Sequence, residues 1–342
     1  MAAPFVIPDQ SPAELSIQSS DGLRLEVAEC CLCDAADDEP LAVGEDFEYH
    51  TSRDTYLAVR CRGCGLVYLK LRPTDSELSR VYPPSYHAFD FSATRYGLAY
   101  TVRRRLEARR LLAVCRGLPA DARILDVGCG DGFHLKLLRE FGPPGWTLEG
   151  VDTSPRAVEA ARAAGLSVRL GSVEEVASEP ARYDLALLIA TIEHVSDPVG
   201  VLGAVRRLLR PGGRVVVATD NAASWSFRVF KGRYWGGYHF PRHWYLFSPT
   251  TIARLAECTG FEVERLGTMV SPVNWTFSIR NALVDWHAPN RLVERFSLGS
   301  PVSLGLFTLV GMAQQLFGRG ELLEVVLRRP VDGVTGSSSD AR

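Results

Sequence analysis

From Ala122 onward, short apolar runs alternate with segments in which apolar residues recur at helical spacing. This alternation is typical of a parallel β-sheet that is covered by helices. The strands that it predicts are Arg123–Val127, Thr147–Val151, Ser167–Leu170, Tyr183–Ala190, Arg214–Thr219, Phe261–Met269 and Glu321–Arg328. The pattern therefore predicts an α/β fold with a doubly wound sheet of seven strands.

Start and stop signals mark the helices between these strands. Ser154-Pro155 and Asp197-Pro198 each place a capping residue before a proline, which is typical of a first helical turn. Gly165 is expected to end the first of these helices, and Pro211-Gly212-Gly213 the second. A further helix is expected over Ser248–Gly260.

Composition divides the rest of the chain into zones. Residues 26–75 hold five of the eight cysteines, and we call them the cysteine module. The predicted organisation is a disordered arm over 1–25, the cysteine module over 26–75, linking helices over 76–120, the main domain over 121–330 with an apolar helical insert over 270–320, and a flexible tail over 331–342. The first residues lack the basic and apolar regions of a signal peptide, so we expect a cytoplasmic protein.

Charge and composition exclude several classes of protein. The 342 residues are 46% hydrophobic and 23% charged, which excludes a disordered or collagen-like chain. The formal net charge of −2 gives no overall basic field for a nucleic acid. The run Arg103–Arg110 is locally basic and is compatible with RNA, but such a run is more often a solvated helix face. No nucleic-acid partner is therefore expected.

Two C-x₂-C pairs, Cys30/Cys33 and Cys61/Cys64, lie in the cysteine module. Each pair can form a tight turn with two thiolates, and four thiolates make a closed tetrahedral site for a structural Zn²⁺ ion. Residues 34–60 separate the pairs, so a long hairpin must lie between them. Gly65 and the strand-like residues after it fit a zinc ribbon. Cys31 is an alternative ligand, and a redox pair is the alternative to zinc.

A glycine-rich loop, Gly128-Cys129-Gly130-Asp131-Gly132, follows the first strand of the main domain and precedes a helix. Glycines let the backbone turn tightly and approach a ligand, beside the N–H groups of the helix start. The spacing is G-x-G-x-G, whereas a dinucleotide site has G-x-G-x-x-G. Asp152 ends the second strand, where a carboxylate can accept hydrogen bonds from ribose hydroxyls. A nicotinamide dinucleotide site and a turn without a ligand are the alternatives.

Five motifs in this order resemble the class I S-adenosylmethionine-dependent methyltransferases. They are DVGCGDG, GVDTS, the acidic loop Gly171–Val176, YDLALLIATIEHVSDP and LLRPGGRVVVATDN. The resemblance covers roughly residues 120–270 and implies a Rossmann-like fold with S-adenosyl-L-methionine as cofactor. Several methyltransferases of natural-product and cell-surface sugar pathways are similar in carrying a Cys₄ module before the catalytic domain.

The resemblance also implies which residues contact the cofactor. Asp126 would lie near the amino-acid end, the backbone of Gly128, Cys129, Gly130 and Gly132 under the methionine and ribose, Asp152 at the ribose, Thr153, Ser172 and Val173 at the adenine, and Ala190 and Thr191 beside the methionine. Many members carry a carboxylate at one of the two positions that Ser172 and Val173 occupy here.

Methyl transfer to an oxygen requires an aligned acceptor and a base, for which histidine is suited. His194 follows the fourth strand, at the edge where open α/β sheets bind substrates. Its alternative role is to structure the strand-to-helix loop.

A second cluster of candidate residues is Tyr234–Phe247, which we call the aromatic segment. Methyltransferases that resemble this chain use it as a wall of the acceptor pocket. We predict that Arg242 binds an anionic group of the acceptor and that His243 is a base or an orienting group. An aromatic lid that supports the core is the alternative. Tyr82–His87 is a further aromatic stretch that is expected near the acceptor.

Residues 297–318 contain no charged side chain, and this length raises the question of a membrane span. Pro301 and several polar residues interrupt the run, and a crossing would separate the last strand from its sheet. We therefore expect a helical insert that touches the inner face of a membrane or covers the acceptor. A packed helical pair or a dimer surface is the alternative, and the oligomeric state is left open.

Together these patterns predict methyl transfer from S-adenosylmethionine to a small molecule. The expected acceptor atom is an oxygen of a sugar, a lipid-linked molecule, a quinol or a natural product. Methylation of rRNA or protein is the first alternative, and a non-catalytic zinc-binding scaffold is the second.

Overall fold

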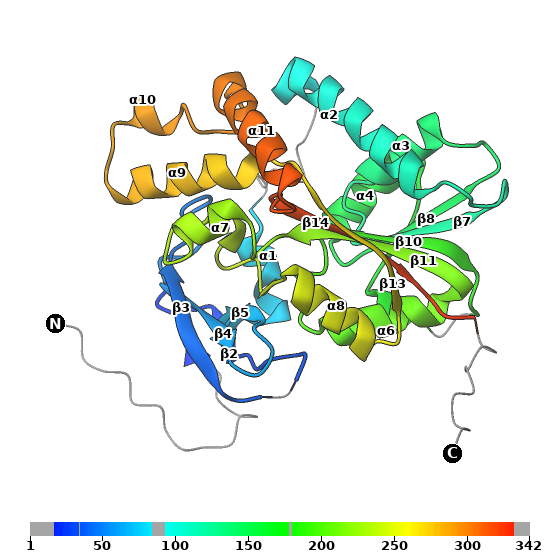
Figure 1. The fold of residues 1–342 in the computed structure, drawn as a ribbon, viewed down its shortest axis with the longest axis horizontal. Coiled ribbons are helices and arrows are strands. Elements are labelled where there is room, and N and C mark those ends of the chain that lie inside the picture. Colours follow the sequence, from blue (N-terminus) through cyan, green and yellow to red (C-terminus); the bar gives the residue numbers. More distant parts are fainter. Residues whose placement is uncertain (1–16, 34, 84–92, 178–179, 332–342) are drawn as a thin grey trace.

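The computed structural model describes residues 17–33, 35–83, 93–177 and 180–331. Its main domain is built on a seven-stranded sheet of order β13-β14-β11-β10-β7-β8-β9 (Figure 1). The strands are β7 (Arg123–Val127), β8 (Thr147–Asp152), β9 (Ser167–Leu170), β10 (Tyr183–Ile189), β11 (Leu209–Asp220), β13 (Glu262–Met269) and β14 (Leu322–Arg328). Neighbours from β9 to β11 are parallel, whereas β14 is antiparallel to both β11 and β13. The predicted α/β sheet is confirmed.

Helices pack on both faces of this sheet because the side chains of its central strand alternate between two cores. Leu185 and Leu187 of β10 pack with α2 (Ala93–Val114) and α3 (Phe133–Phe141), whereas Ala186 and Leu188 pack with α6 (Pro198–Leu208) and α8 (Pro249–Cys258). The shorter helices beside the sheet are α4 (Pro155–Ala163) and α5 (Val173–Val176).

The predicted capping residues begin their helices as expected. The Ser154 side chain accepts a hydrogen bond from the Ala157 amide, and the Asp197 side chain accepts one from the Gly200 amide. Pro211-Gly212-Gly213 differs from the prediction. The helix before it ends at Leu208, and the three residues form a bulge at the start of β11 between the pairs Tyr183–Leu209 and Leu185–Arg214.

The strands of the cysteine module take part in two small sheets. One joins β1 (Ile17–Gln18), β2 (Arg24–Val27) and β6 (Leu71–Pro73), and the other has the order β12-β5-β4-β3, with β3 (Asp38–Gly44), β4 (Tyr56–Cys61), β5 (Val67–Leu69) and β12 (Tyr245–Leu246). The predicted disordered arm is therefore wrong for residues 17–25, which form β1, a turn and the start of β2. Residues 1–16, and the predicted tail after Val331, lie outside the described residues.

One strand of the second small sheet comes from the main domain. β12 belongs to the aromatic segment, and Tyr245 pairs with Tyr68 of β5 in an antiparallel register. The cysteine module is thus joined to the main domain by backbone hydrogen bonds as well as by side chains. After it, η1 (Asp75–Glu77) and α1 (Leu78–Val81) lead toward the main domain.

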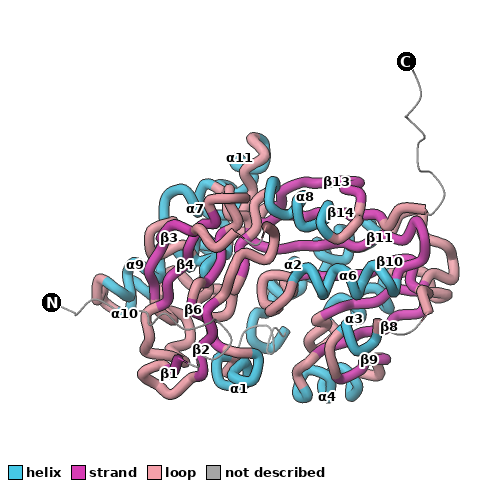
Figure 2. Tube along the Cα trace, turned by 90° about the horizontal axis from the view of Figure 1, so that it is seen from below, coloured by secondary structure: helices cyan, strands magenta, loops and turns pink. Residues whose placement is uncertain are grey.

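The predicted insert between β13 and β14 is helical. It consists of α9 (Val273–Asp285), α10 (Asn290–Val293) and α11 (Pro301–Leu316), and α9 contacts both of the other helices (Figure 1). In Figure 2, α11 projects from the molecule. α9 contacts α7 (Trp225–Phe230) and η3 (Gly236–Tyr238), so the insert packs beside the aromatic segment. Among the described residues, no helix combines the length and apolar character that a membrane crossing needs.

A buried ion pair connects the cysteine module to the aromatic segment. The side chains of Asp46 and Arg242 are both 0% exposed. Nη1 and Nη2 of Arg242 donate to the two carboxylate oxygens of Asp46 at 3.0 and 2.8 Å. The remaining N–H groups donate to the carbonyl oxygens of Val81 and Phe240 and to the Thr51 hydroxyl. All five guanidinium N–H groups therefore have acceptors within the protein.

Asp46→Asn tests how much stability this pair provides. The substitution leaves the Arg242 charge uncompensated in the interior, so we expect the free energy of unfolding to fall by about 3–5 kcal/mol in urea titrations. Burial raises the pKa of Asp46, but hydrogen bonds and the charge of Arg242 outweigh it and lower the pKa to about 2. The contribution is therefore present above the ordinary aspartate pKa and is lost as the pH falls toward 2.

Glu262→Gln is the matched control, because the Arg328–Glu262 pair has side chains that are 51% and 53% exposed. Its loss should cost less than about 1 kcal/mol. Equal effects of the two substitutions would contradict a special role for the buried pair.

Candidate functional site

The order of strands in the sheet reverses between β7 and β10, and both of these strands end at the same edge. In open α/β sheets, ligands bind in the crevice that forms at such a reversal. Asp126 lies near the end of β7, Asp152 ends β8, and Thr191 follows β10. The predicted cofactor residues therefore meet at one edge of the sheet.

Three glycines of the glycine loop have a left-handed backbone conformation, which residues with a side chain adopt only with strain. Gly128, Gly130 and Gly132 have φ values of +68°, +56° and +81°. A Cβ atom on Gly128 would lie 2.7 Å from the Thr191 side chain, whereas one on Gly130 would meet no atom within 4 Å. The loop is thus fixed on the side of Thr191 and faces open space at Gly130, as a loop beside a bound ligand requires.

Asp152 connects this loop to β8. Its Oδ2 accepts a hydrogen bond from the Gly130 amide, and its Oδ1 accepts one from the Ser154 amide, both at 2.8 Å. Burial raises the pKa of this carboxyl. Each oxygen has a second lone pair, so the oriented carboxylate can still accept hydrogen bonds from two vicinal hydroxyls.

Asp126 has an unused acceptor at the other end of the loop. The residue is buried, and its Oδ2 accepts no hydrogen bond from any described residue. The nearest cation is the His134 ring, whose Nδ1 lies 3.7 Å from this oxygen. Burial lowers the pKa of His134, but Asp126 and Glu107 outweigh it and raise the pKa to about 9. The open acceptor fits the ammonium group of a bound amino acid.

The remaining predicted cofactor residues lie around the same edge in different states. Thr153 is exposed, and Ala190 has a left-handed backbone with φ of +52°. The Val173 side chain is buried in the core, so only its backbone can face a ligand. Ser172 caps α5, and its amide donates to the Glu175 carboxylate at 3.0 Å. Glu175 therefore places a carboxylate next to the positions that lacked one in the sequence prediction.

Three histidines gather beyond β10. The ring centroid of His243 lies 4.6 Å from that of His194 and 4.9 Å from that of His239. Nδ1 of His194 lies 3.1 Å from the Arg242 carbonyl oxygen and 2.8 Å from the Tyr82 hydroxyl. A proton on Nδ1 can be donated to this carbonyl oxygen, which only accepts, and would leave the lone pair of the neutral ring on Nε2. The same reasoning applies to His243, whose Nδ1 donates to the Gly237 carbonyl at 2.8 Å.

Burial and neighbouring charges set the protonation of this cluster. Burial lowers the pKa of His194 well below its usual value, and the adjacent His243 and His239 lower it further. Burial raises the pKa of Glu193 to about 8, with a contribution from Asp220, whose own pKa burial raises to about 7. His194 is therefore neutral at neutral pH. The neighbouring carboxyl groups of Glu193 and Asp220 titrate near neutral pH.

Sequence reasoning did not identify the acidic partners of the histidines. Asp220 Oδ2 lies 3.4 Å from Nδ1 of His243, and Asp220 Oδ1 accepts a hydrogen bond from the Asn274 amide group of α9. Glu48, from the cysteine module, lies 2.8 Å from Nδ1 of His239. Glu193 directly precedes His194 and Asp220 lies in the motif LLRPGGRVVVATDN, whereas Glu48 has no sequence signal that relates it to His239.

The prediction for Arg242 requires correction. We expected its guanidinium to bind an anionic group of the acceptor, but Asp46 and three other partners use all of its donors. Arg242 instead fixes the backbone of the aromatic segment, including the carbonyl that faces His194. Tyr82 lies beside His194 as expected, whereas residues 84–87 of the same stretch are outside the described residues.

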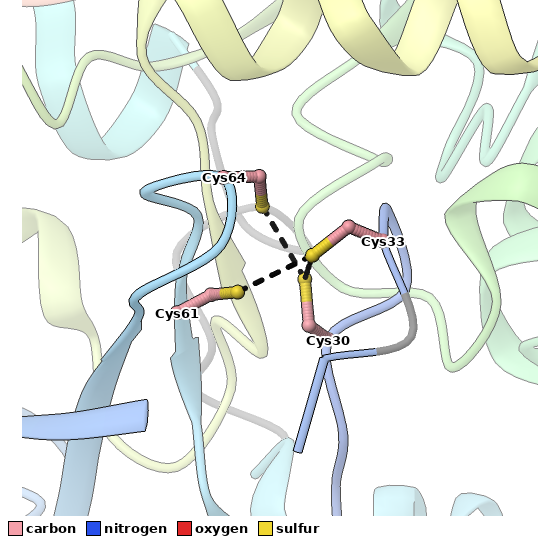
Figure 3. Close-up of side chains that lie close together, drawn as sticks. All are labelled: Cys30, Cys33, Cys61 and Cys64. Carbon is pink, nitrogen blue, oxygen red and sulfur yellow. Dashed lines mark hydrogen bonds between the residues drawn. The ribbon is translucent and has the colours of Figure 1, made fainter. Parts of the chain in front are cut away.

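The four predicted zinc ligands converge at one point (Figure 3). The Sγ atoms of Cys30 and Cys64 are 3.4 Å apart, those of Cys33 and Cys61 also 3.4 Å, and those of Cys30 and Cys33 3.6 Å. Four sulfurs at about 2.3 Å from a zinc ion lie roughly 3.8 Å apart in a tetrahedron, so the cluster fits zinc with little adjustment. Cys31, the alternative ligand, lies outside this group of four.

Comparison with known proteins agrees with this geometry. A family model described as a methyltransferase domain matches residues 99–266. The ubiquinone biosynthesis O-methyltransferase of Cereibacter sphaeroides is 32% identical over 169 residues, which cover 46% of this chain and 67% of that protein. The enzyme of the same name from Thiobacillus denitrificans is 33% identical over 165 residues, which cover 44% of this chain and 68% of that protein.

Among solved structures, a SAM-dependent methyltransferase from Archaeoglobus fulgidus is similar, with a TM-score of 0.46 and 18% identity. The match covers 70% of this chain and 97% of that chain. The identity to the curated relatives, which extends over two thirds of their length, decides the family. The chain belongs to the class I S-adenosylmethionine-dependent methyltransferases.

Proposed function

We propose that the chain methylates an oxygen of a small, phenol-like or quinol-like acceptor. The observation that carries this proposal is the neutral His194, oriented by the Arg242 carbonyl and next to the Tyr82 hydroxyl at the edge that also holds the glycine loop. The curated relatives are named as O-methyltransferases of ubiquinone biosynthesis, which supports a hydroxyl on an aromatic ring as the acceptor.

The cofactor supplies an electrophilic methyl group on a sulfonium, which leaves as a neutral thioether. Asp126 and Asp152 would hold its amino-acid and ribose ends, and the backbone from Gly128 to Gly132 would lie beneath it. His194 would accept the proton of the acceptor hydroxyl on Nε2. Asp220, 3.4 Å from the His243 ring, would stabilise a proton that arrives on that second histidine.

Burial of the histidines favours a small acceptor over a macromolecule. The side chain of His243 is 10% exposed, so the acceptor must enter the site. The arginine run on α2 is not fully available to bind RNA, because two of its arginines pair with acidic side chains. Arg104 pairs with Glu140, and Arg110 pairs with Glu107 and Glu324. We therefore propose a small-molecule acceptor. We also propose a cytoplasmic location, where thiols stay reduced.

Asp152→Ala tests the cofactor site. Loss of a charged acceptor for two hydroxyls should raise the Kd for S-adenosylhomocysteine by about 10- to 100-fold, since hydrogen bonds to charged groups contribute about 1.5–3 kcal/mol. Isothermal titration calorimetry measures this change. Glu159→Ala, on the exposed side of α4, is the control and should leave the Kd unchanged. An unchanged Kd in Asp152→Ala would refute the assignment of the ribose site.

His194→Asn and His243→Asn test the proposed base. Each should lower kcat by about 10²- to 10⁴-fold, because proton transfer contributes that much, while the Kd for S-adenosylhomocysteine is retained. Turnover with a catechol or hydroquinone acceptor is the measurement. His287→Asn, at an exposed position of the insert, is the matched control. Normal turnover in both site variants would exclude a histidine base.

We also propose that the four-cysteine cluster holds structural zinc. Four thiolate ligands close the coordination shell, so the ion would stabilise the fold and leave no position for substrate. Elemental analysis should find about one zinc per chain, and Cys61→Ser should lose it. Cys31→Ser should keep the metal, since Cys31 lies outside the cluster. The proposal would be contradicted if wild-type protein that was produced in zinc-containing medium contained no zinc.

A further inference from the structure

Only one face of α11 is covered by the rest of the protein. Its inner face is buried through Ser303, Phe307, Gly311 and Gln314, and the helix contacts α9 and β13. Gln314 accepts a hydrogen bond from the indole of Trp275 and donates one to Glu321, so polar anchors fix the helix to the domain. The inner face is therefore committed to the protein.

The outer face of α11 is apolar along its whole length. It is formed by Val302, Leu306, Leu309, Met312 and Leu316, all of which are exposed. Leu309 is 66% exposed and Leu316 86% exposed. The exposed face of a surface helix is ordinarily polar, and an apolar face of this extent indicates a binding partner.

The charged residues that flank this face in the sequence are mainly positive. Residues 297–318 carry no charge, and the nearest charged residues in the sequence are Arg295 and Arg319, which are both exposed. Arg291 on α10 adds a third exposed cation, and Glu294 is the exposed acid among them. Trp286 and Phe317, at 67% and 69% exposure, add large aromatic rings at the ends of α9 and α11. Apolar residues with arginines and aromatic rings at the margin are typical of a helix that lies at a lipid interface.

We infer that the outer face of α11 docks on a bilayer surface that contains anionic lipids, with the helix in the plane of the membrane. Sixteen residues span about 24 Å, less than the roughly 30 Å of a hydrocarbon core. A symmetric contact with a second copy is disfavoured, because it would bring the arginines of both copies together. The arginines instead complement anionic headgroups. This inference holds whichever acceptor the enzyme methylates.

Co-sedimentation with vesicles tests the inference on the full-length protein. We expect the wild type to bind phosphatidylglycerol vesicles at least tenfold more tightly than phosphatidylcholine vesicles. Leu309→Gln/Leu316→Gln should weaken binding to phosphatidylglycerol at least tenfold, and Arg291→Gln/Arg295→Gln should remove most of the preference for it. Leu106→Gln, at a 59% exposed position of α2, is the matched control and should bind as the wild type does.

Three outcomes would overturn the inference. The first is a wild type that binds neither kind of vesicle, and the second is a double leucine variant that binds as tightly as the wild type. The third is a wild type that is dimeric in analytical ultracentrifugation while the double leucine variant is monomeric. Methyl transfer to a water-soluble acceptor should be unchanged in the leucine variant, which separates this test from that of the proposed function.

Discussion

The ion pair between Asp46 and Arg242 joins the cysteine module to the aromatic segment of the main domain. Two charges without solvent are tolerated only when hydrogen bonds satisfy them, and here all five guanidinium donors have acceptors. The partners come from the cysteine module, from α1 and from the aromatic segment itself. Arg242 consequently has one permitted position, and its carbonyl orients the ring of His194. The geometry of the candidate base therefore depends on a residue almost 200 positions away in the sequence.

The histidine and carboxylate cluster shows how burial sets protonation. Removal from water disfavours every charge, so it lowers the pKa of His194 and raises those of Glu193 and Asp220. The pKa values of the two kinds of group thereby exchange their usual order, so that both carboxyl groups titrate above His194. At neutral pH the neutral imidazole therefore has a lone pair with which it can accept the proton of a reacting hydroxyl.

Local signals in the sequence account for what could be predicted. A short apolar run locates β10, a proline after Ser154 locates α4, and glycine spacing locates the loop at Gly128. The role of Arg242 could not be predicted, because its partner Asp46 has no sequence signal that relates the two. β12 was also missed, since two residues of strand in an aromatic stretch have no periodicity to recognise. The charge of His134 on α3 depends on Glu107 of α2 and Asp126 of β7, and only the packing of α3 against both elements brings the three side chains together.

The position of β14 has a consequence for the order in which the chain can fold. This strand lies between β11 and β13, antiparallel to both, and comes after the entire insert. On the ribosome, β13 therefore emerges with no neighbour, and β11 keeps an open edge until residues 322–328 have left the exit tunnel. The parallel half of the sheet can assemble early, whereas the other half must wait until β14 has been synthesised. The candidate cofactor residues at the ends of β7 and β8 thus belong to the part of the sheet that can form first.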